Sequence, residues 1–145
     1  MLAFIQRVLH DLVTQSPHTL FVHFPIALCG SALFFILLAL WKKSDILEII
    51  AFANISLAAV STIVTGAMGI RDNLAFYAGL AANHWAKIIL ASILFVITSL
   101  TAIARWRNPN LFHSSGKGLY IASYFVCFGI VSVLGFLGAV IIYGF

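Results

Sequence analysis

Residues 17–41 read PHTLFVHFPIALCGSALFFILLALW, an almost uninterrupted apolar run that ends on a tryptophan. A helix needs about 20 apolar residues to cross the hydrocarbon core of a membrane, so this run is long enough to span a bilayer. Ser16 is a favoured N-cap, and Pro17 suits the first helical position because its missing N–H costs nothing there. The stretch therefore predicts a membrane-spanning helix with a marked start.

Three more runs of this kind follow, over residues 46–70, 83–106 and 119–143. The connections between them are short, which favours antiparallel neighbours in an up-down-up-down bundle. All three tryptophans lie at the ends of runs, as expected of an aromatic belt at the two membrane interfaces. We expect an all-α integral membrane protein, with one four-helix transmembrane domain over residues 16–145.

The composition agrees with this fold class and excludes several others. Of the 145 residues, 63% are hydrophobic and 8% are charged, whereas soluble domains are nearer to about 45–50% and about 25%. A soluble monomer, a disordered chain and a nucleic-acid-binding protein are therefore excluded. Cys29 and Cys127 lie inside apolar runs without a paired framework, so we expect them to pack as small apolar residues near the bilayer centre.

Residues 1–15 have a different pattern. Polar residues recur at three- and four-residue spacing among apolar ones, which indicates an amphipathic helix that is too short to span and lies in the membrane interface. A signal peptide needs an uninterrupted apolar stretch. Because Arg7, His10 and Asp11 interrupt it, we expect the segment to be retained.

The basic residues of the predicted loops indicate an orientation. Five lie after the first and third spans, and three lie on the opposite side. The first set is Lys42, Lys43, Arg105, Arg107 and Lys117, and the second is Arg7, Arg71 and Lys87. For a multi-pass protein of the cell inner membrane, the positive-inside rule then predicts that both termini are non-cytoplasmic.

Ionisable residues gather at one end of the predicted bundle. They are His18 and His23 in the first span, Arg71 and Asp72 after the second, and His84 and Lys87 at the start of the third. Burying such groups without partners is costly, so they are functional candidates by default. His18 and His23 are separated by about 140° around a straight helix, so we expect only one of them to face a shared site.

Haem b is the first cofactor that these residues suggest. Imidazole is a standard axial ligand of haem iron, and His23 with His84 would supply one from each of two facing helices. Arg71 and Lys87 would lie near the haem propionates. The sequence contains no CxxCH motif, so the haem would be held without covalent attachment. The function expected from this site is that of a membrane b-type cytochrome-like protein, which fits an electron-transfer or binding protein better than a catalyst.

Other interpretations stay open. His18, His23, Asp72 and His84 would form a nitrogen and oxygen site suited to zinc or copper in a metal-binding or transport protein. The chain would otherwise be a non-catalytic subunit of a larger membrane complex, with its histidines in interhelical hydrogen bonds. The small residues near them either make room for a macrocycle or serve close helix packing.

The stretch SPHTLFVHFPIAL, residues 16–28, resembles the opening signature of the family catalogued as Domain of Unknown Function 2231. The likeness continues through TGAMGIRD, AANHWAK and GFLGAVIIYGF and covers residues 16–145. It implies a small four-helix membrane domain of prokaryotic type, with His23, Asp72 and His84 as motif residues. Some relatives are joined to Rieske-type iron–sulfur domains. The resemblance therefore implies electron transfer across or along the membrane with such a protein. The haem hypothesis offers a quinone as an alternative partner, and a homo-oligomer would add histidines from a second protomer.

Overall fold

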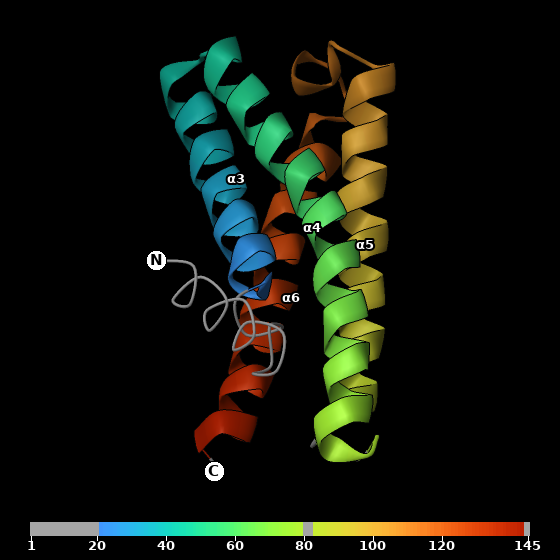
Figure 1. The fold of residues 1–145 in the computed structure, drawn as a ribbon. Coiled ribbons are helices and arrows are strands. Elements are labelled where there is room, and N and C mark those ends of the chain that lie inside the picture. Colours follow the sequence, from blue (N-terminus) through green and yellow to red (C-terminus); the bar gives the residue numbers. More distant parts are fainter. Residues whose placement is uncertain (1–20, 80–82, 144–145) are drawn as a thin grey trace, which may run out of the picture.

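The computed structural model describes residues 21–79 and 83–143, without the side chains of 140–143. The described residues form four long helices and one short 3₁₀ turn: α3 (His23–Lys42), α4 (Asp45–Tyr77), α5 (His84–Arg107), η1 (Leu111–His113) and α6 (Lys117–Tyr143). All four helices are long and apolar enough to span a membrane. They run alternately up and down (Figure 1), which confirms the predicted four-helix membrane bundle.

The end of α3, the start of α4 and both ends of α5 and α6 lie within two residues of the predicted spans, whereas α3 begins at His23 and α4 ends later than predicted. α4 does not end at residue 70 but continues to Tyr77. Its 33 residues correspond to a length of about 50 Å. The fall in hydropathy at Arg71 and Asp72 marks the expected end of the apolar run, but backbone hydrogen bonding does not stop there. The predicted helix start at Pro17 and the interfacial segment over residues 1–15 lie outside the described residues.

A two-residue link forces α3 and α4 into an antiparallel pair. Lys43 adopts the left-handed conformation, with φ 51° and ψ 46°, and its N–H donates to the carbonyl of Ala39. Ser44 is extended, and its N–H donates to the same carbonyl at 3.1 Å. Lys42 lies in the last turn of α3, where a positive charge complements the helix dipole.

The core of the bundle is built from one face of each helix. On α4 the buried residues recur at three- and four-residue spacing, which is the stripe of an inward-facing helix. The buried side chains are Pro25, Cys29, Ala32, Ile36 and Ala39 of α3; Glu48, Ala51, Ile55, Ala58, Ala59, Thr62 and Asp72 of α4; Leu94, Thr98 and Thr101 of α5; and Tyr120, Tyr124, Cys127 and Val131 of α6. Alanine is frequent on α3 and α4, and small residues allow close approach of helices in lipid.

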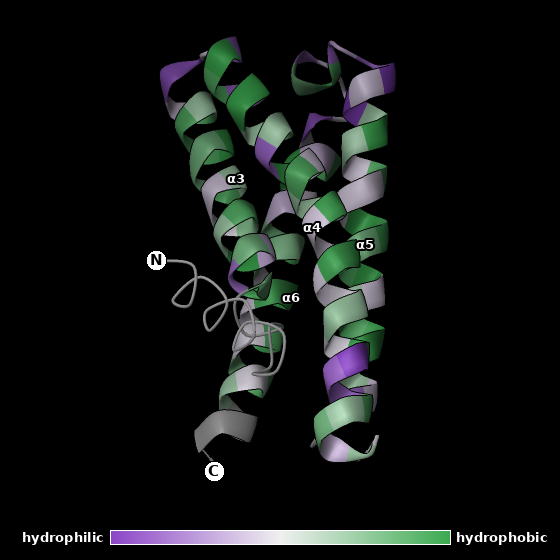
Figure 2. Cartoon of the chain, in the orientation of Figure 1, coloured by the Kyte–Doolittle hydropathy of each residue, from purple (hydrophilic) through white to green (hydrophobic). Residues whose placement is uncertain are grey.

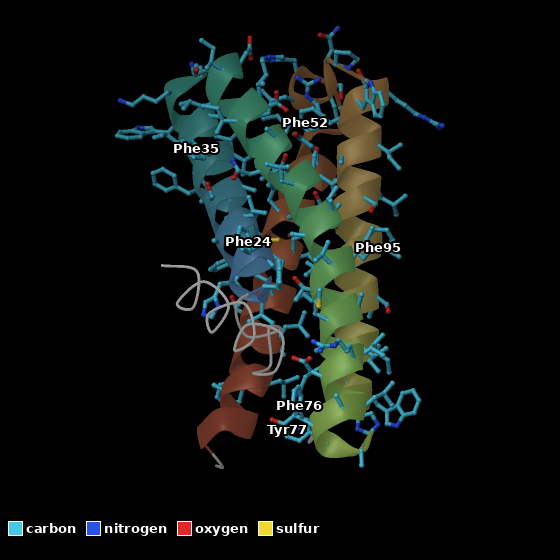
Figure 3. The ribbon with its side chains drawn as sticks, in the orientation of Figure 1. Phe24, Phe35, Phe52, Phe76, Tyr77 and Phe95 are labelled. Atoms are coloured by element: carbon cyan, nitrogen blue, oxygen red, sulfur yellow. The ribbon has the colours of Figure 1, made fainter. Side chains whose placement is uncertain are left out.

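The outer faces are apolar. Large hydrophobic side chains such as Phe34, Leu100 and Phe136 are exposed on them. Figure 2 shows mostly hydrophobic residues along the middle of the helices, and Figure 3 shows side chains projecting outward from them. Trp41 and Trp106 are exposed at the end of the bundle that holds the α3–α4 link. This pattern suits helices surrounded by lipid, with tryptophans at the interface.

Candidate functional site

His23 lies on the outer face of α3. The residue is exposed, whereas Pro25 and Cys29, which lie on the opposite side of the helix, are buried. The Thr65 hydroxyl of α4 donates to the Phe21 carbonyl at 3.1 Å, so α3 begins beside Thr65. Figure 1 shows this start well inside the length of α4. His23 therefore lies on the side of α3 opposite to Pro25 and Cys29, which pack into the described bundle.

Asp72 lies about two helical turns farther along α4 than Thr65. It is 3% exposed and continues the inward stripe of α4. The Nη1 atom of Arg71, which is exposed, lies 3.6 Å from Asp72 Oδ1. The structure therefore contains the Arg71–Asp72 pair at the end of the bundle where the sequence predicted a site.

His84 and Lys87 occupy the first turn of α5, and both are half-buried. The His84 ring lies 5.2 Å from that of Trp85. In the described part of the chain, no three His, Cys, Asp or Glu residues lie close enough together to hold a metal ion. The described residues thus place His23, Asp72 and His84 in one half of the bundle without joining them into a metal centre. His18 lies outside the described residues.

The glycines of the bundle separate into two groups. A Cβ atom on Gly30 would lie 3.5 Å from Phe128, and one on Gly135 would lie 3.4 Å from Ile26, so these two serve close packing of α3 on α6. A Cβ on Gly66 or Gly138 would meet no described atom within 4 Å. The latter two are partly buried and leave space in the half that holds the predicted site.

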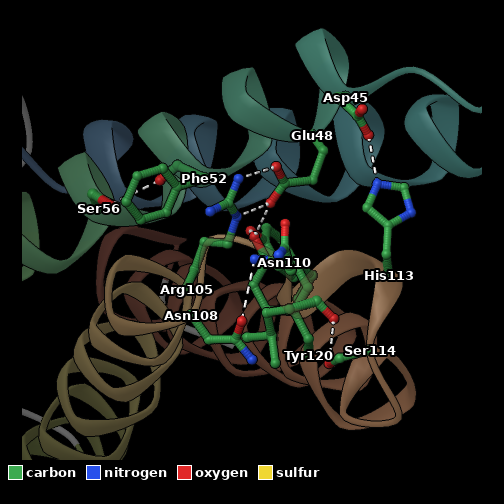
Figure 4. Close-up of polar contacts among 12 residues, drawn as sticks. Asp45, Glu48, Phe52, Ser56, Arg105, Asn108, Asn110, His113, Ser114 and Tyr120 are labelled. Atoms are coloured by element: carbon green, nitrogen blue, oxygen red, sulfur yellow. Dashed lines mark hydrogen bonds and ion pairs between the residues drawn. The ribbon is translucent and has the colours of Figure 1, made fainter.

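The opposite end of the bundle contains a buried charged residue, Glu48, which is 1% exposed. Arg105 of α5 donates to it through two hydrogen bonds, from Nε to Oε1 at 2.7 Å and from Nη2 to Oε2 at 2.8 Å (Figure 4). The guanidinium also lies 5.6 Å from the centre of the Phe52 ring. Both carboxylate oxygens are therefore paired, as the cost of burying a charge requires.

Two tyrosines of α6 extend this arrangement into the core. The Tyr120 hydroxyl donates to Glu48 Oε1 at 2.7 Å, and the Tyr124 hydroxyl donates to the Tyr120 oxygen at 2.7 Å. Both tyrosines are buried, and their rings are perpendicular. We call Glu48, Arg105, Tyr120 and Tyr124 the Glu48 centre. It joins three helices and runs from the end of the bundle toward its middle.

A pocket of about 140 Å³ lies over the Glu48 centre. Its lining residues are Asp45, Glu48, Arg105, Pro109, Asn110, Phe112 and His113. At the rim, His113 Nε2 of η1 lies 2.7 Å from Asp45 Oδ1 of α4 (Figure 4). Asp45, Asn110 and His113 are exposed, so the pocket opens at the end of the bundle, and Glu48 is among its lining residues.

Sequence reasoning missed this centre. The sequence predicts Arg105 only as one of the positive charges that indicate orientation, and it does not predict Glu48, Tyr120 or Tyr124 as site residues. A signal was present, because Glu48 shares the three- and four-residue spacing of Ala51, Ile55 and Ala58 and must therefore face inward with them. Tyr120 and Tyr124 are four residues apart, which places them on one face of a helix.

A family model described as "Predicted membrane protein (DUF2231)" matches residues 15–145. The chain belongs to this family. The match confirms the resemblance found in the sequence and covers nearly the whole chain, including every described residue of the Glu48 centre. The DUF2231 description supports a membrane protein and names no activity. No match is found among the curated proteins or the solved structures.

Proposed function

We propose that the Glu48 centre takes up and releases protons at one face of the membrane. The observation that carries this proposal is a carboxylate, 1% exposed inside a membrane-spanning helix, that lies at the base of a pocket and at one end of a hydroxyl chain. Ionisable residues buried in a membrane bundle mark ion pathways and proton relays. Glu48 is the group that gains and loses the proton.

Arg105 and Asp45 keep the charges paired during this change. While Glu48 is ionised, the Arg105 guanidinium neutralises it through two hydrogen bonds. When Glu48 takes a proton from water in the pocket, its attraction for Arg105 falls. Asp45 lines the same pocket and offers Arg105 a second carboxylate, so the guanidinium moves toward the rim and is not left buried without a partner.

The tyrosine hydroxyls pass the change in hydrogen bonding toward the core. A hydroxyl both donates and accepts, so the chain from Tyr124 through Tyr120 to Glu48 can run in either direction. With Glu48 ionised, both hydroxyls donate toward the carboxylate. With Glu48 protonated, its O–H donates to Tyr120 and both hydroxyls reverse. The hydroxyl of Tyr124 is then the donor available in the core. It lies one helical turn, about 6 Å along α6, from the level of Tyr120.

Isotope-edited infrared spectroscopy tests the proposal at a single site, because Glu48 is the only glutamate in the chain. The protein is labelled with carboxyl-¹³C glutamate, placed in lipid nanodiscs and titrated. We expect the labelled carboxylate band to convert to a protonated carboxyl band as the pH falls, and tyrosine bands to change with it. Tyr120→Phe should shift the transition, and Arg107→Gln, an exposed control, should not. A labelled carboxylate that stays ionised wherever the protein is folded contradicts the proposal.

A second function, electron transfer through one haem b, is favoured by the other half of the bundle. His84 and Lys87 are half-buried there, Asp72 is buried, and a Cβ on Gly66 or Gly138 would meet no described atom within 4 Å. This residue set fits a haem in composition: His84 supplies an axial imidazole, and Lys87 with Arg71 supplies cations for the propionates. His23 would be the second ligand. Bound haem would supply one-electron chemistry, with a Rieske-type protein or a quinone as partner in the inner membrane.

Visible absorption of the detergent-purified protein tests the haem proposal. A Soret band should be present, and His84→Ala or His23→Ala should abolish the low-spin spectrum or make it five-coordinate. His113→Ala is the matched control, because His113 lies at the other end of the bundle. Absence of a Soret band from protein made with ample haem rules out this function. Metal analysis of the same sample then tests the zinc or copper alternative at His18, His23, Asp72 and His84.

A further inference from the structure

His113 contacts the carboxylate that Arg105 needs when Glu48 takes up a proton. Its Nε2 atom lies 2.7 Å from Asp45 Oδ1, and both residues line the same pocket as Arg105. Figure 4 shows this contact beside the paired side chains of Glu48 and Arg105. The residues that line the pocket thus include two carboxylates, and each of them has one basic partner.

The fold holds His113 at the rim through contacts that do not depend on its charge. The preceding residue, Phe112, is 4% exposed and anchors η1 in the core. The Lys117 Nζ atom lies 4.8 Å from the centre of the Phe112 ring, and the His113 ring meets that ring edge-on, with 5.2 Å between ring centres. The His113 N–H also donates to the Asn110 carbonyl at 2.9 Å. Loss of the charge on His113 therefore weakens its hold on Asp45 without removing the ring from the pocket.

The charge of the pocket depends on His113. The charged side chains around it are Asp45 and Glu48 of α4, Arg105 of α5 and Lys117 of α6. Histidine changes its charge between pH 5 and 8. The charges of the pocket-lining residues balance when His113 is protonated, and one negative charge is in excess when it is neutral. Protonated His113 forms an ion pair with Asp45, whereas the neutral ring offers at most one hydrogen bond through Nε2.

We propose that His113 regulates proton uptake at the Glu48 centre by competing with Arg105 for the Asp45 carboxylate. The inference rests on the proposed function and adds a regulator to it. While His113 is protonated, it keeps Asp45. The Arg105 guanidinium then stays on Glu48 and favours its ionised form. When His113 loses its proton, Asp45 becomes available to Arg105, and Glu48 accepts a proton more readily. His113 is therefore a positioning residue, and its protonation moves uptake at Glu48 to a lower pH.

The isotope-edited infrared titration of Glu48 in nanodiscs tests this regulation with variants at exposed positions. His113→Gln removes the charge of the competitor and should move the protonation of Glu48 to higher pH by about 0.3–0.7 pH unit, the size of one exposed charge interaction. The same substitution in an Asp45→Asn protein should give a clearly smaller shift, because no carboxylate is left to compete for. Arg107→Gln is the control for loss of a positive charge, since Arg107 is exposed and does not line the pocket.

Nuclear magnetic resonance of ring-¹⁵N histidine measures the reverse effect. The His113 signals are assigned by their loss in His113→Gln. Glu48→Gln is an uncharged substitute for protonated Glu48 and should send Arg105 to Asp45. His113 should then lose its proton at lower pH than in the wild-type protein. In an Asp45→Asn background, Glu48→Gln should add at most a small further shift. The infrared measurement does not depend on the folding of Glu48→Gln, because its own variants are at exposed positions.

The outcomes separate failure of the regulation from failure of proton uptake. The regulation alone is overturned if Glu48 titrates but does not respond to His113→Gln, or responds equally with and without the Asp45 carboxylate. A His113 titration that is the same in the wild-type and Glu48→Gln proteins also overturns it. A Glu48 that stays ionised in every folded variant contradicts proton uptake itself and overturns the regulation with it.

Discussion

Glu48 and Arg105 are 57 positions apart in the sequence, yet their side chains meet through two hydrogen bonds of 2.7 and 2.8 Å. The pair joins α4 to α5, and Tyr120 brings α6 to the same carboxylate. One buried residue thus connects three of the four described helices, and the remaining one, α3, is held at this end by its short link to α4 and by apolar packing.

Arg105→Gln should destabilise the bundle by about 3–5 kcal/mol, because it leaves the Glu48 charge buried without its partner. Unfolding in mixed detergent micelles measures this change. Arg107→Gln removes the same charge two residues away at an exposed position and should cost little. Equal stability of the two variants would show that the buried ion pair contributes nothing.

The two tyrosines should differ in their effect on stability. Tyr124→Phe removes one hydrogen bond, so it should cost about 0.5–1.5 kcal/mol. Tyr120→Phe should cost more, because it takes a donor from Glu48 and also leaves the Tyr124 hydroxyl without its acceptor. The same unfolding assay compares them, with Tyr77→Phe as the exposed control. A larger loss of stability for Tyr124→Phe than for Tyr120→Phe would contradict the observed direction of these hydrogen bonds, from Tyr124 through Tyr120 to Glu48.

The contact between His113 and Asp45 should contribute little, although its 2.7 Å distance is short. Both side chains are largely exposed, and exposed ion pairs are typically worth less than about 1 kcal/mol and are screened by salt. His113→Ala should therefore change the unfolding free energy only slightly at low ionic strength and not at all in high salt. A large effect that persists in salt would indicate a structural role for this contact.

Lys43→Gly should stabilise the protein. Lys43 has φ 51°, and the left-handed conformation costs a residue with a Cβ about 1–2 kcal/mol, a cost that glycine avoids. Part of the gain is offset by the greater freedom of glycine in the unfolded chain. Lys43→Ile, with a branched Cβ, should change stability in the opposite direction. Thermal unfolding of the two variants shows whether each substitution raises or lowers stability. A change in the same direction for both would contradict the left-handed conformation of Lys43.

Reporter fusions should follow the alternating helices. Two spans, α4 and α5, separate Lys43 from Ser115, so fusions at these positions should report the same side of the membrane. A fusion after Phe145 should report the other side, because α6 lies between. The greater number of basic residues near Lys43 and Ser115 predicts that their side is cytoplasmic. Matching signals at Ser115 and Phe145 would contradict four spans.

The fold was predictable because length and hydropathy decide it. A run such as residues 83–106 leaves only a spanning helix as a way to satisfy backbone hydrogen bonds in lipid, and the observed α5 differs from it by one residue at each end. The end of α4 was not predictable in this way. Hydropathy marks where the hydrocarbon ends, whereas the helix ends where Ala78 turns to the left-handed conformation.

The candidate site was only partly predictable. The gathering of Asp72, His84 and Lys87 at one end follows from the alternation of the spans. The pairing of Glu48 with Arg105 does not, because it depends on how each helix is rotated about its axis and on the relative heights of α4 and α5. The same applies to His23. Its position near the start of α3 indicates depth, but only packing determines that Pro25 and Cys29 face inward and His23 outward.

α4 is longer than the described α3, and its last turns continue past the end of its own apolar run. α3 has 20 residues, which matches a hydrocarbon core of about 30 Å, whereas α4 extends well beyond that. Leu74, Phe76 and Tyr77 are exposed on the last turns of α4, beyond the charged Arg71. They form a hydrophobic patch at this end of the helix. Because the apolar run of α4 ends at Arg71 and Asp72, these last turns suit the membrane interface, where aromatic side chains are favoured. The end of α4 therefore adds aromatic residues to the interface beyond its hydrocarbon-spanning part.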